Sequence, residues 1–280
     1  MQFLIDTPPT HTVLQLSDLH VVPAGELFYG VDTLGNVAAV FDQIERSGIT
    51  ADALLLSGDL VDGGDAASYR RLRALVERRA AALGLPVLYL MGNHDQRRPF
   101  REALLGARPS DEPYDFVHWA GELRIIGLDS SRPGSALGEL SEAQLDWLAE
   151  QLATAAPAGT ILALHHPPLP SPIALMRRLA LAEPARLGAV IAGTDVRIVL
   201  SGHSHHASGG VLAGVPVWVC GATSTSSYAL AAPGLYTAVT GGLFTRVDVY
   251  PGQAVATALP LPPGSTVFEL TPDLLAQGAG

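Results

Sequence analysis

The sequence contains a single cysteine, Cys220, in 280 residues. One cysteine cannot form a disulfide within the chain, so no disulfide framework supports the fold. This cysteine usage suits a reducing compartment. Because Cys220 ends an apolar run, we expect its thiol to be a small core side chain rather than a nucleophile.

The sequence also contains few basic residues. It has 17 Lys and Arg and 27 Asp and Glu, which gives a formal net charge of −10. Duplex nucleic acid requires a basic surface, so we expect no such partner. A small phosphorylated substrate is still compatible with this charge, because bound metal ions would reverse the local field.

Long apolar runs are absent too. No run approaches the roughly 20 residues that span a bilayer, so we expect no transmembrane segment. The first six residues lack the basic stretch and the apolar core of a secretory signal. We therefore expect a cytoplasmic protein.

Hydrophobic residues make up 48% of the chain and charged residues 16%, which is the composition of a folded globular protein. In the first third, the apolar runs 12–17, 53–57 and 86–91 predict buried strands, and the patterns 33–47 and 66–83 predict helices. This alternation indicates βαβ units and a mainly parallel sheet. In such sheets ligands bind beyond the carboxyl ends of the strands.

The rest of the chain predicts further strands and helices. The segment 224–242 is rich in Ser, Ala and Gly, and we expect a mobile flap there. We find no repeat and no linker, so we expect one domain with two sheets over 1–262 and a short, weakly ordered tail over 263–280. The predicted strands are 116–119, 123–128, 160–164, 196–200, 243–250 and 255–261, with a hairpin over 210–220 and helices from near 141 and over 184–191.

His203 and His205 follow the run 196–200 and are two residues apart. On an extended chain such residues point the same way, so both imidazoles would face one site. On a helix they would diverge by about 200°. A surface loop that happens to contain histidines is the alternative explanation, and the other strand ends decide between the two.

Polar residues follow five of the predicted strands. Carboxylates, an amide oxygen and imidazoles together suit first-row metals rather than a thiolate site. Seven ligands are too many for one tetrahedral zinc but suit two metals that share a carboxylate. The polar residues that follow the five strands are, in chain order, Asp18 and His20, Asp59 with Asp62, Asn93 and His94, His165, and His203 with His205.

These blocks resemble, in order, the five signature motifs of calcineurin-like metallophosphoesterases. The resemblance implies an α/β fold, a four-layer α/β/β/α sandwich of two mixed β-sheets flanked by helices. It implies two metal ions, for which iron and manganese are expected and zinc is an alternative. One ion would take Asp18, His20, Asp59 and His205, and the other Asp59, Asn93, His165 and His203. The motifs are Asp18-Leu19-His20, Gly58-Asp59-Leu60-Val61-Asp62, Gly92-Asn93-His94-Asp95, His165-His166-Pro167 and Gly202-His203-Ser204-His205.

The chemistry follows from charge. Two metals would neutralise an anionic phosphodiester and generate the attacking hydroxide at neutral pH. His94 comes directly after Asn93, and we expect it to act as general acid or to stabilise the transition state. The resemblance implies that Asp62 orients His94. Asp95 is expected to brace the loop.

Two more residues are candidates for substrate contact. Alternation along an extended chain would turn His166 and His206 away from the metals, yet His206 remains a candidate at the mouth of the site. Tyr29 is a candidate because it would line the pocket as part of a lid, with an ordinary surface aromatic as the alternative.

The substrate class is narrowed by three features. Gly63-Gly64 stands where serine/threonine protein phosphatases carry an arginine, and the chain lacks the basic surface of a repair nuclease. The segments 27–33 and 160–170 resemble class III cyclic nucleotide phosphodiesterases, most closely the actinobacterial cyclic AMP group. We therefore expect hydrolysis of 3′,5′-cyclic nucleotides to 5′-nucleotides, with cyclic AMP as the first candidate, and a homodimer.

Two alternatives stay open. The first is a broad phosphodiesterase that acts on 2′,3′-cyclic nucleotides or glycerophosphodiesters. The second is a non-catalytic scaffold with the same fold, which is disfavoured because such proteins usually lose ligands and this chain retains all seven.

Overall fold

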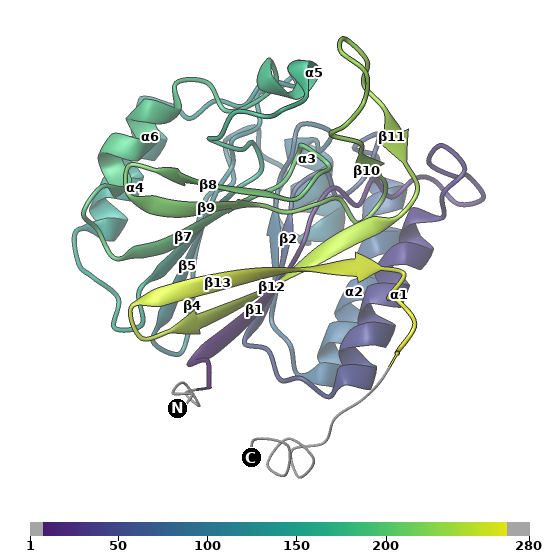
Figure 1. The fold of residues 1–280 in the computed structure, drawn as a ribbon, viewed down its shortest axis with the longest axis horizontal. Helices are drawn as coiled ribbons and strands as arrows, with labels where there is room; N and C mark the ends of the chain where they lie inside the picture. The colour runs from purple at the N-terminus through teal and green to yellow at the C-terminus, as the bar shows by residue number, and fades with distance from the viewer. Residues whose placement is uncertain (1–7, 268–280) are drawn as a thin grey trace.

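The structure is a computed structural model that describes residues 8–267. Two mixed β-sheets lie face to face, and helices cover the outer face of each (Figure 1). Most of the tail predicted over 263–280 lies outside the described residues, and 263–267 form no regular element.

The first sheet has the strand order β13-β12-β1-β2-β3. Strands β1, β2 and β3 run parallel, and β3 forms one edge of the sheet. Leu14 of β1 lies opposite Leu54 of β2, which lies opposite Val87 of β3. The long hairpin β12–β13 pairs antiparallel with β1 and completes the other edge. The bounds are β1 His11–Leu16, β2 Ala53–Ser57, β3 Val87–Leu90, β12 Gly242–Tyr250 and β13 Gln253–Leu261.

The second sheet has the order β4-β5-β6-β7-β9-β8. Strands β5, β6, β7 and β9 are parallel, and the two edge strands β4 and β8 are antiparallel to their neighbours. The bounds are β4 Phe116–Ala120, β5 Leu123–Leu128, β6 Thr160–Leu164, β7 Val196–Ser201, β8 Ser208–Leu212 and β9 Val215–Val219.

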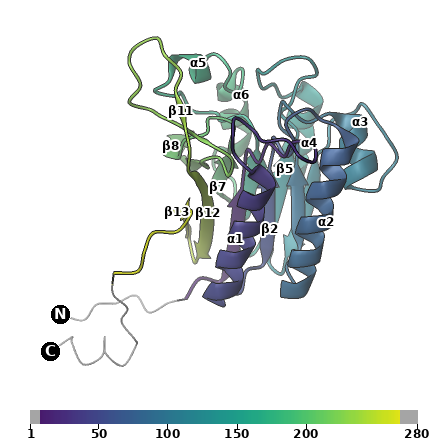
Figure 2. The same cartoon turned by 90° about the vertical axis from the view of Figure 1, so that its right-hand side faces the viewer.

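Helices α1 (Thr33–Ser47) and α2 (Ala66–Leu83) lie side by side on the first sheet (Figure 2). Each begins at an aspartate whose carboxylate accepts a backbone N–H three residues on, Asp32 from Gly35 and Asp65 from Ser68. Helices α4 (Glu142–Leu152) and α6 (Pro184–Ile191) cover the second sheet. Among the described helices, none combines the length and apolarity needed to cross a bilayer.

Three apolar clusters separate four layers. Leu54 and Leu56 of β2 pack against α1 and α2, whereas Leu55 between them packs into the cluster between the sheets. The same alternation divides β6, since Leu162 faces α4 and α6 and Ile161 faces the first sheet. The predicted four-layer sandwich of two mixed sheets is therefore confirmed.

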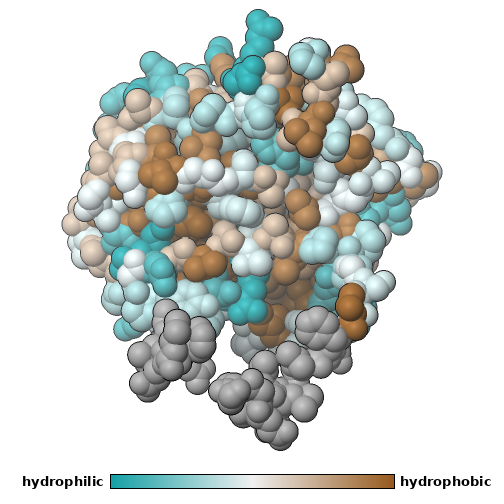
Figure 3. Space-filling model, in the orientation of Figure 1, coloured by the Kyte–Doolittle hydropathy of each residue, from teal (hydrophilic) through white to brown (hydrophobic). Residues whose placement is uncertain are grey.

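The sequence did not predict several short elements. These are α3 (Arg97–Pro99), a π-helical turn (Phe100–Leu104), α5 (Ala174–Arg177) and the strands β10 (Ser226–Ser227) and β11 (Ala238–Val239). Strands β10 and β11 pair as a ribbon within the segment 224–242, for which we predicted a flap. Leu230, between β10 and β11, and Leu175 of α5 are exposed, and Figure 3 shows hydrophobic residues scattered over this face of the molecule.

Candidate metal centre and active site

The polar motifs meet because the parallel strands of both sheets end at one edge of the sandwich. Strands β1, β2 and β3 deliver the first three motifs, and β6 and β7 deliver the other two. Ligand atoms of Asp18, His20 and His205 lie within 4.8 Å of one another, and so do those of Asp59, His165 and His203. Residues that follow β1, β2, β6 and β7 thus form these two groups of potential metal ligands.

Asp59 lies between the two groups. Its Oδ2 is 3.3 Å from His165 Nε2 and 3.6 Å from His20 Nε2. Burial alone would raise the pKa of the Asp59 carboxyl, but the histidines around it, above all His165, hold that pKa well below its usual range. The carboxylate is therefore charged and placed to serve both groups.

Hydrogen bonds on the outer side of the imidazoles fix which nitrogen faces inward. His165 Nδ1 donates to the Ser57 carbonyl and His205 Nδ1 to the Thr225 carbonyl, both at 2.9 Å. A carbonyl accepts only, so Nδ1 carries the proton and the Nε2 lone pair can point into the site when the ring is neutral. Burial also lowers the pKa of His205 and lowers that of His203 to about 4, which favours the neutral form.

Several inward atoms make no hydrogen bond to any of the residues that the structure describes. His165 Nε2, His203 Nε2 and Asn93 Oδ1 are buried without a hydrogen bond. His20 Nε2 and His205 Nε2 face each other at 3.1 Å. Buried polar atoms are normally satisfied, and these are nitrogen and oxygen donors that bind divalent cations. The residues present therefore fit two metal ions.

The backbone at the ligands is strained. Five of the seven expected ligands adopt positive φ angles, a conformation that costs about 1–3 kcal/mol for a non-glycine residue. Such strain persists only where the surrounding structure enforces it, as it does at functional sites. The five residues are Asp18 (φ 53°), His20 (46°), Asp59 (49°), His203 (67°) and His205 (55°).

The prediction of an extended chain at His203 and His205 is wrong. Residues 203–206 form a bend after β7, and the two imidazoles reach different ligand groups through left-handed backbone. The cause is a long-range hydrogen bond, because the His203 N–H donates to the Asp18 carboxylate at 2.9 Å. That bond pulls the chain away from the strand direction.

Three glycines allow the motif loops to approach one another. A Cβ at Gly92 would overlap Asp59 Oδ1 and the Asp59 backbone nitrogen, and would lie 2.8 Å from His165 Nε2. A Cβ at Gly58 would overlap His165 Nδ1, and one at Gly202 would overlap Ser17 Oγ. Each glycine immediately precedes or adjoins an expected ligand, so the close packing holds these ligands in place.

His94 and Asp62 form a pair beside the ligands. His94 Nδ1 is 2.8 Å from the Asp62 carbonyl and 3.2 Å from Asp62 Oδ1, and the same Oδ1 lies 3.1 Å from His20 Nδ1. The bond to Asp62 outweighs burial and raises the pKa of His94 to about 10. The structure thus places the His94 ring beside the ligand groups, and its Nε2 makes no hydrogen bond to any described residue.

Asp95 braces the third motif, as expected. Its buried carboxylate accepts N–H groups from Gly92 at 2.8 Å and from Leu60 at 3.2 Å, and it accepts the Tyr69 hydroxyl at 2.8 Å. The loops that carry Asp59 and Asn93 are therefore tied together by one side chain.

A cavity of about 520 Å³ opens over the centre. Its floor includes Asp59, Asn93 and His94, and Tyr29 stands at its rim with 90% of its surface exposed. His206 does not belong to this lining; it is buried, and its Nε2 is 3.0 Å from Ser171 Oγ.

Sequence reasoning missed much of the cavity wall. Phe28 stacks on His20 with 4.8 Å between ring centroids, and Tyr236 comes from the loop between β10 and β11. Phe28 lies in the segment 27–33 that resembles cyclic nucleotide phosphodiesterases, but that resemblance gave it no role, and no motif marks Tyr236. Leu175, Met176 and Leu179 around α5 complete the wall.

Comparisons with known proteins identify the family. The model of the calcineurin-like phosphoesterase family matches residues 11–207, which contain all five motifs. The chain belongs to this family. Its members use a dimetal centre, and this phosphoesterase has candidate ligand groups for one.

Relatives and solved structures support the same assignment. The phosphoesterase is 43% identical over 261 residues to a cAMP/cGMP dual specificity phosphodiesterase of Mycobacterium tuberculosis, covering 92% of this chain and 82% of that protein. It is 46% identical over 215 residues to a probable cyclic nucleotide phosphodiesterase of Rhodococcus erythropolis, covering 77% and 71%. A dimetal phosphatase from Danio rerio shares the fold, with a TM-score of 0.64 at 16% identity over 89% of this chain and 96% of that one.

Proposed function

We propose that this phosphoesterase hydrolyses 3′,5′-cyclic nucleotides to 5′-nucleotides, with cyclic AMP as the first substrate. The observation that carries the proposal is the pair of ligand groups, with His165 Nε2, His203 Nε2 and Asn93 Oδ1 left without a hydrogen bond, beneath a cavity of about 520 Å³ that also holds His94. Relatives at 43–46% identity that are named cyclic nucleotide phosphodiesterases support the substrate class.

Two metal ions, when bound, supply the charge that neutralises the phosphate and activates water. We propose that Asp18, His20, Asp59 and His205 hold one ion and that Asp59, Asn93, His165 and His203 hold the other, in line with the two ligand groups. Iron and manganese suit these nitrogen and oxygen donors, and zinc would also be accepted.

His94 supplies the proton for the departing O3′. Its Nδ1 is held by Asp62, so the Nε2–H is the one available to the cavity. Asp62 orients the ring and holds it cationic, since its carboxyl accounts for the raised pKa of His94. The alkoxide is a poor leaving group without that proton, and a positioned acid contributes about 10²–10⁴-fold in rate.

The nucleoside lies against the part of the cavity wall that Phe28 and Tyr29 form. Tyr29 offers an exposed ring at the tip of a tight turn in which Phe28 and Val31 exchange two backbone hydrogen bonds. A base that stacks there would gain about 1–3 kcal/mol. Since His206 bonds to Ser171 outside the lining, a role for His206 in substrate contact would require that bond to break.

The proposal is tested with protein of measured metal content. Metal-loaded protein should hydrolyse cyclic AMP and bis(p-nitrophenyl) phosphate, and the stripped protein should not. Loaded protein that binds about two ions per chain but leaves both diesters intact would refute the enzyme and favour the scaffold.

Three further proposals concern organisation. We propose that residues 1–262 form one domain, that the protein is a homodimer and that it is cytoplasmic. Limited proteolysis, light scattering during size-exclusion chromatography and cell fractionation test these in turn. A proteolytic cut that releases two folded pieces, a monomeric mass or a membrane-bound pool would contradict them.

A further inference from the structure

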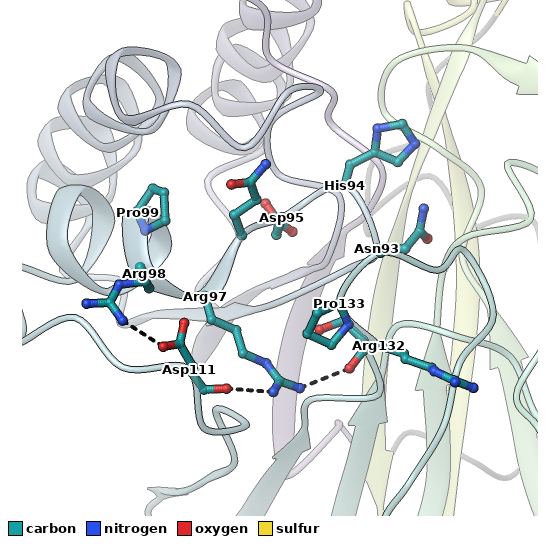
Figure 4. A pocket seen from close by; sticks show the side chains of 12 residues that line it. Asn93, His94, Asp95, Arg97, Arg98, Pro99, Asp111, Arg132 and Pro133 are labelled. Carbon is teal, nitrogen blue, oxygen red and sulfur yellow. Dashed lines mark hydrogen bonds and ion pairs between the residues drawn. The ribbon is translucent and has the colours of Figure 1, made fainter.

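A second cavity, of about 420 Å³, adjoins the first (Figure 4). Asn93 and His94 line both cavities, so the two meet at these side chains. Each volume is in the range of a site for one small-molecule group. A cyclic mononucleotide whose phosphate lies over the ligand groups needs only the first cavity. The second cavity therefore has no role in binding that substrate.

Three arginines line the second cavity. Figure 4 shows Arg98 and Arg132 on opposite sides of it, with Arg97 between them. Arg97 is committed to the protein, because it donates to the Asp111 carbonyl at 2.8 Å and to Asp129 Oδ2 at 3.0 Å. It therefore forms part of the floor.

The other two arginines are available to an anion. Arg98 pairs with Asp111, which also lines the cavity, at 2.6 Å, and Arg132 pairs with Glu139 at 3.4 Å. Both pairs are exposed on both partners, and such pairs contribute only about 0–1 kcal/mol. A phosphate that accepts from a guanidinium can therefore replace these contacts at little cost.

The position of His94 between the two cavities indicates which part of a substrate the second cavity would bind. The group that protonates the departing oxygen has to lie beside that oxygen, within hydrogen-bond reach. Whatever is attached to the departing oxygen must then extend past His94, which also lines the second cavity. In a cyclic diester both oxygens belong to one ribose, so nothing extends there. In an open-chain diester a second nucleotide does.

We propose that the second cavity is a leaving-group subsite and that the enzyme also cleaves open-chain diesters whose leaving alcohol carries a further phosphate. The inference rests on the proposed phosphodiesterase function. The linear dinucleotide 5′-phosphoadenylyl-(3′→5′)-adenosine, pApA, has this chemistry. Water adds to the internal phosphorus, the P–O3′ bond breaks, and O3′ takes a proton from His94. The products are two molecules of 5′-AMP, and the terminal 5′-phosphate of the leaving one lies between Arg98 and Arg132.

The test compares pApA with ApA, which differs only by lacking the 5′-phosphate, and includes cyclic AMP as reference. We expect kcat/KM for pApA to exceed that for ApA by about tenfold, the factor that corresponds to about 1.4 kcal/mol of charge-assisted hydrogen bonding. The double variant R98A/R132A should lose this preference and keep its activity on ApA and cyclic AMP. Arg132→Lys should retain part of it. Arg178→Ala, which removes an exposed arginine that lines neither cavity, is the control for overall charge.

A binding measurement separates the subsite from the catalytic proposal. Calorimetric titration of metal-stripped protein with pApA and ApA should show tighter binding of pApA in the wild type and equal binding in R98A/R132A. Hydrolysis of cyclic AMP with no preference for pApA would overturn the subsite and leave the proposed function standing. No hydrolysis of any diester, together with a pApA preference in binding, would overturn the function alone. A preference that survives in R98A/R132A would also overturn the subsite.

Discussion

Replacing Gly92 by alanine tests whether close packing of the motif loops holds the metal centre. Gly92 is not among the residues with positive φ, so the backbone accepts alanine and only the added methyl matters. That methyl would overlap both the carboxylate and the backbone nitrogen of Asp59, and would lie 2.8 Å from His165 Nε2. Two expected ligands would have to move together.

The magnitude follows from how little a metal ligand can move. Ligand distances are tolerated within about 0.2 Å, and relieving the overlap with Asp59 requires more than that. The Asp59 backbone cannot swing aside, because its motif loop is tied through Leu60 to Asp95. We expect metal affinity to fall by at least about 10–100-fold, the usual effect of disturbing the support of a ligand. Overpacking should lower the free energy of unfolding by about 1–3 kcal/mol.

The assay measures Mn²⁺ affinity by titration calorimetry, metal content by mass spectrometry and thermal unfolding by circular dichroism. Gly63→Ala is the matched control, because a Cβ there meets nothing within 4 Å and its φ is not positive. The control should bind two ions and unfold as the wild type does. If Gly92→Ala bound two ions with wild-type affinity, the steric reasoning would be refuted.

Three more predictions follow from single side chains. Asn93→Ala removes a buried, unpartnered amide oxygen, so it should reduce the metal content from about two ions to one and abolish most turnover, as metal analysis and a cyclic AMP assay would show. His94→Ala should keep both ions but lose about 10²–10⁴-fold in kcat, with the smallest loss for diesters that have good leaving groups; loss of metal would contradict its role as acid. Cys220 is buried and burial raises the pKa of its thiol to about 12, so Ellman's reagent at pH 8 should find no thiol in native protein and one after unfolding in guanidinium; reaction in the native state would contradict its burial.

The strands and their polar ends could be predicted because short apolar runs carry a local signal. The run 53–57 is buried at every position, and both the strand and the aspartate that follows it lie where the sequence placed them. The caps at Asp32 and Asp65 are equally local, since each accepts an N–H three residues on. Such features need no knowledge of distant segments.

The features that the sequence did not reveal depend on distant partners. The bend at His203 is imposed by a hydrogen bond to Asp18, 185 residues earlier in the chain. Tyr236 joins the cavity wall because β10 and β11 pair into a ribbon, and a strand of two residues has too little periodicity to be recognised. The arginine cavity is likewise assembled from the third motif and the loops at Asp111 and Arg132, which no local pattern connects.

The same long-range contacts explain why the centre can be rigid before any ion binds. The inward nitrogens of His165 and His205 are aimed by hydrogen bonds from Nδ1 to backbone carbonyls, one of them at the end of β2. The left-handed backbone at Asp59 costs free energy that only the packed sandwich can offset. Ligands that are already rigid lose little entropy when a cation binds. The free energy that the strained backbone costs the fold therefore contributes to metal affinity. Mutations that relax the strained loops should therefore stabilise the fold and weaken metal binding together.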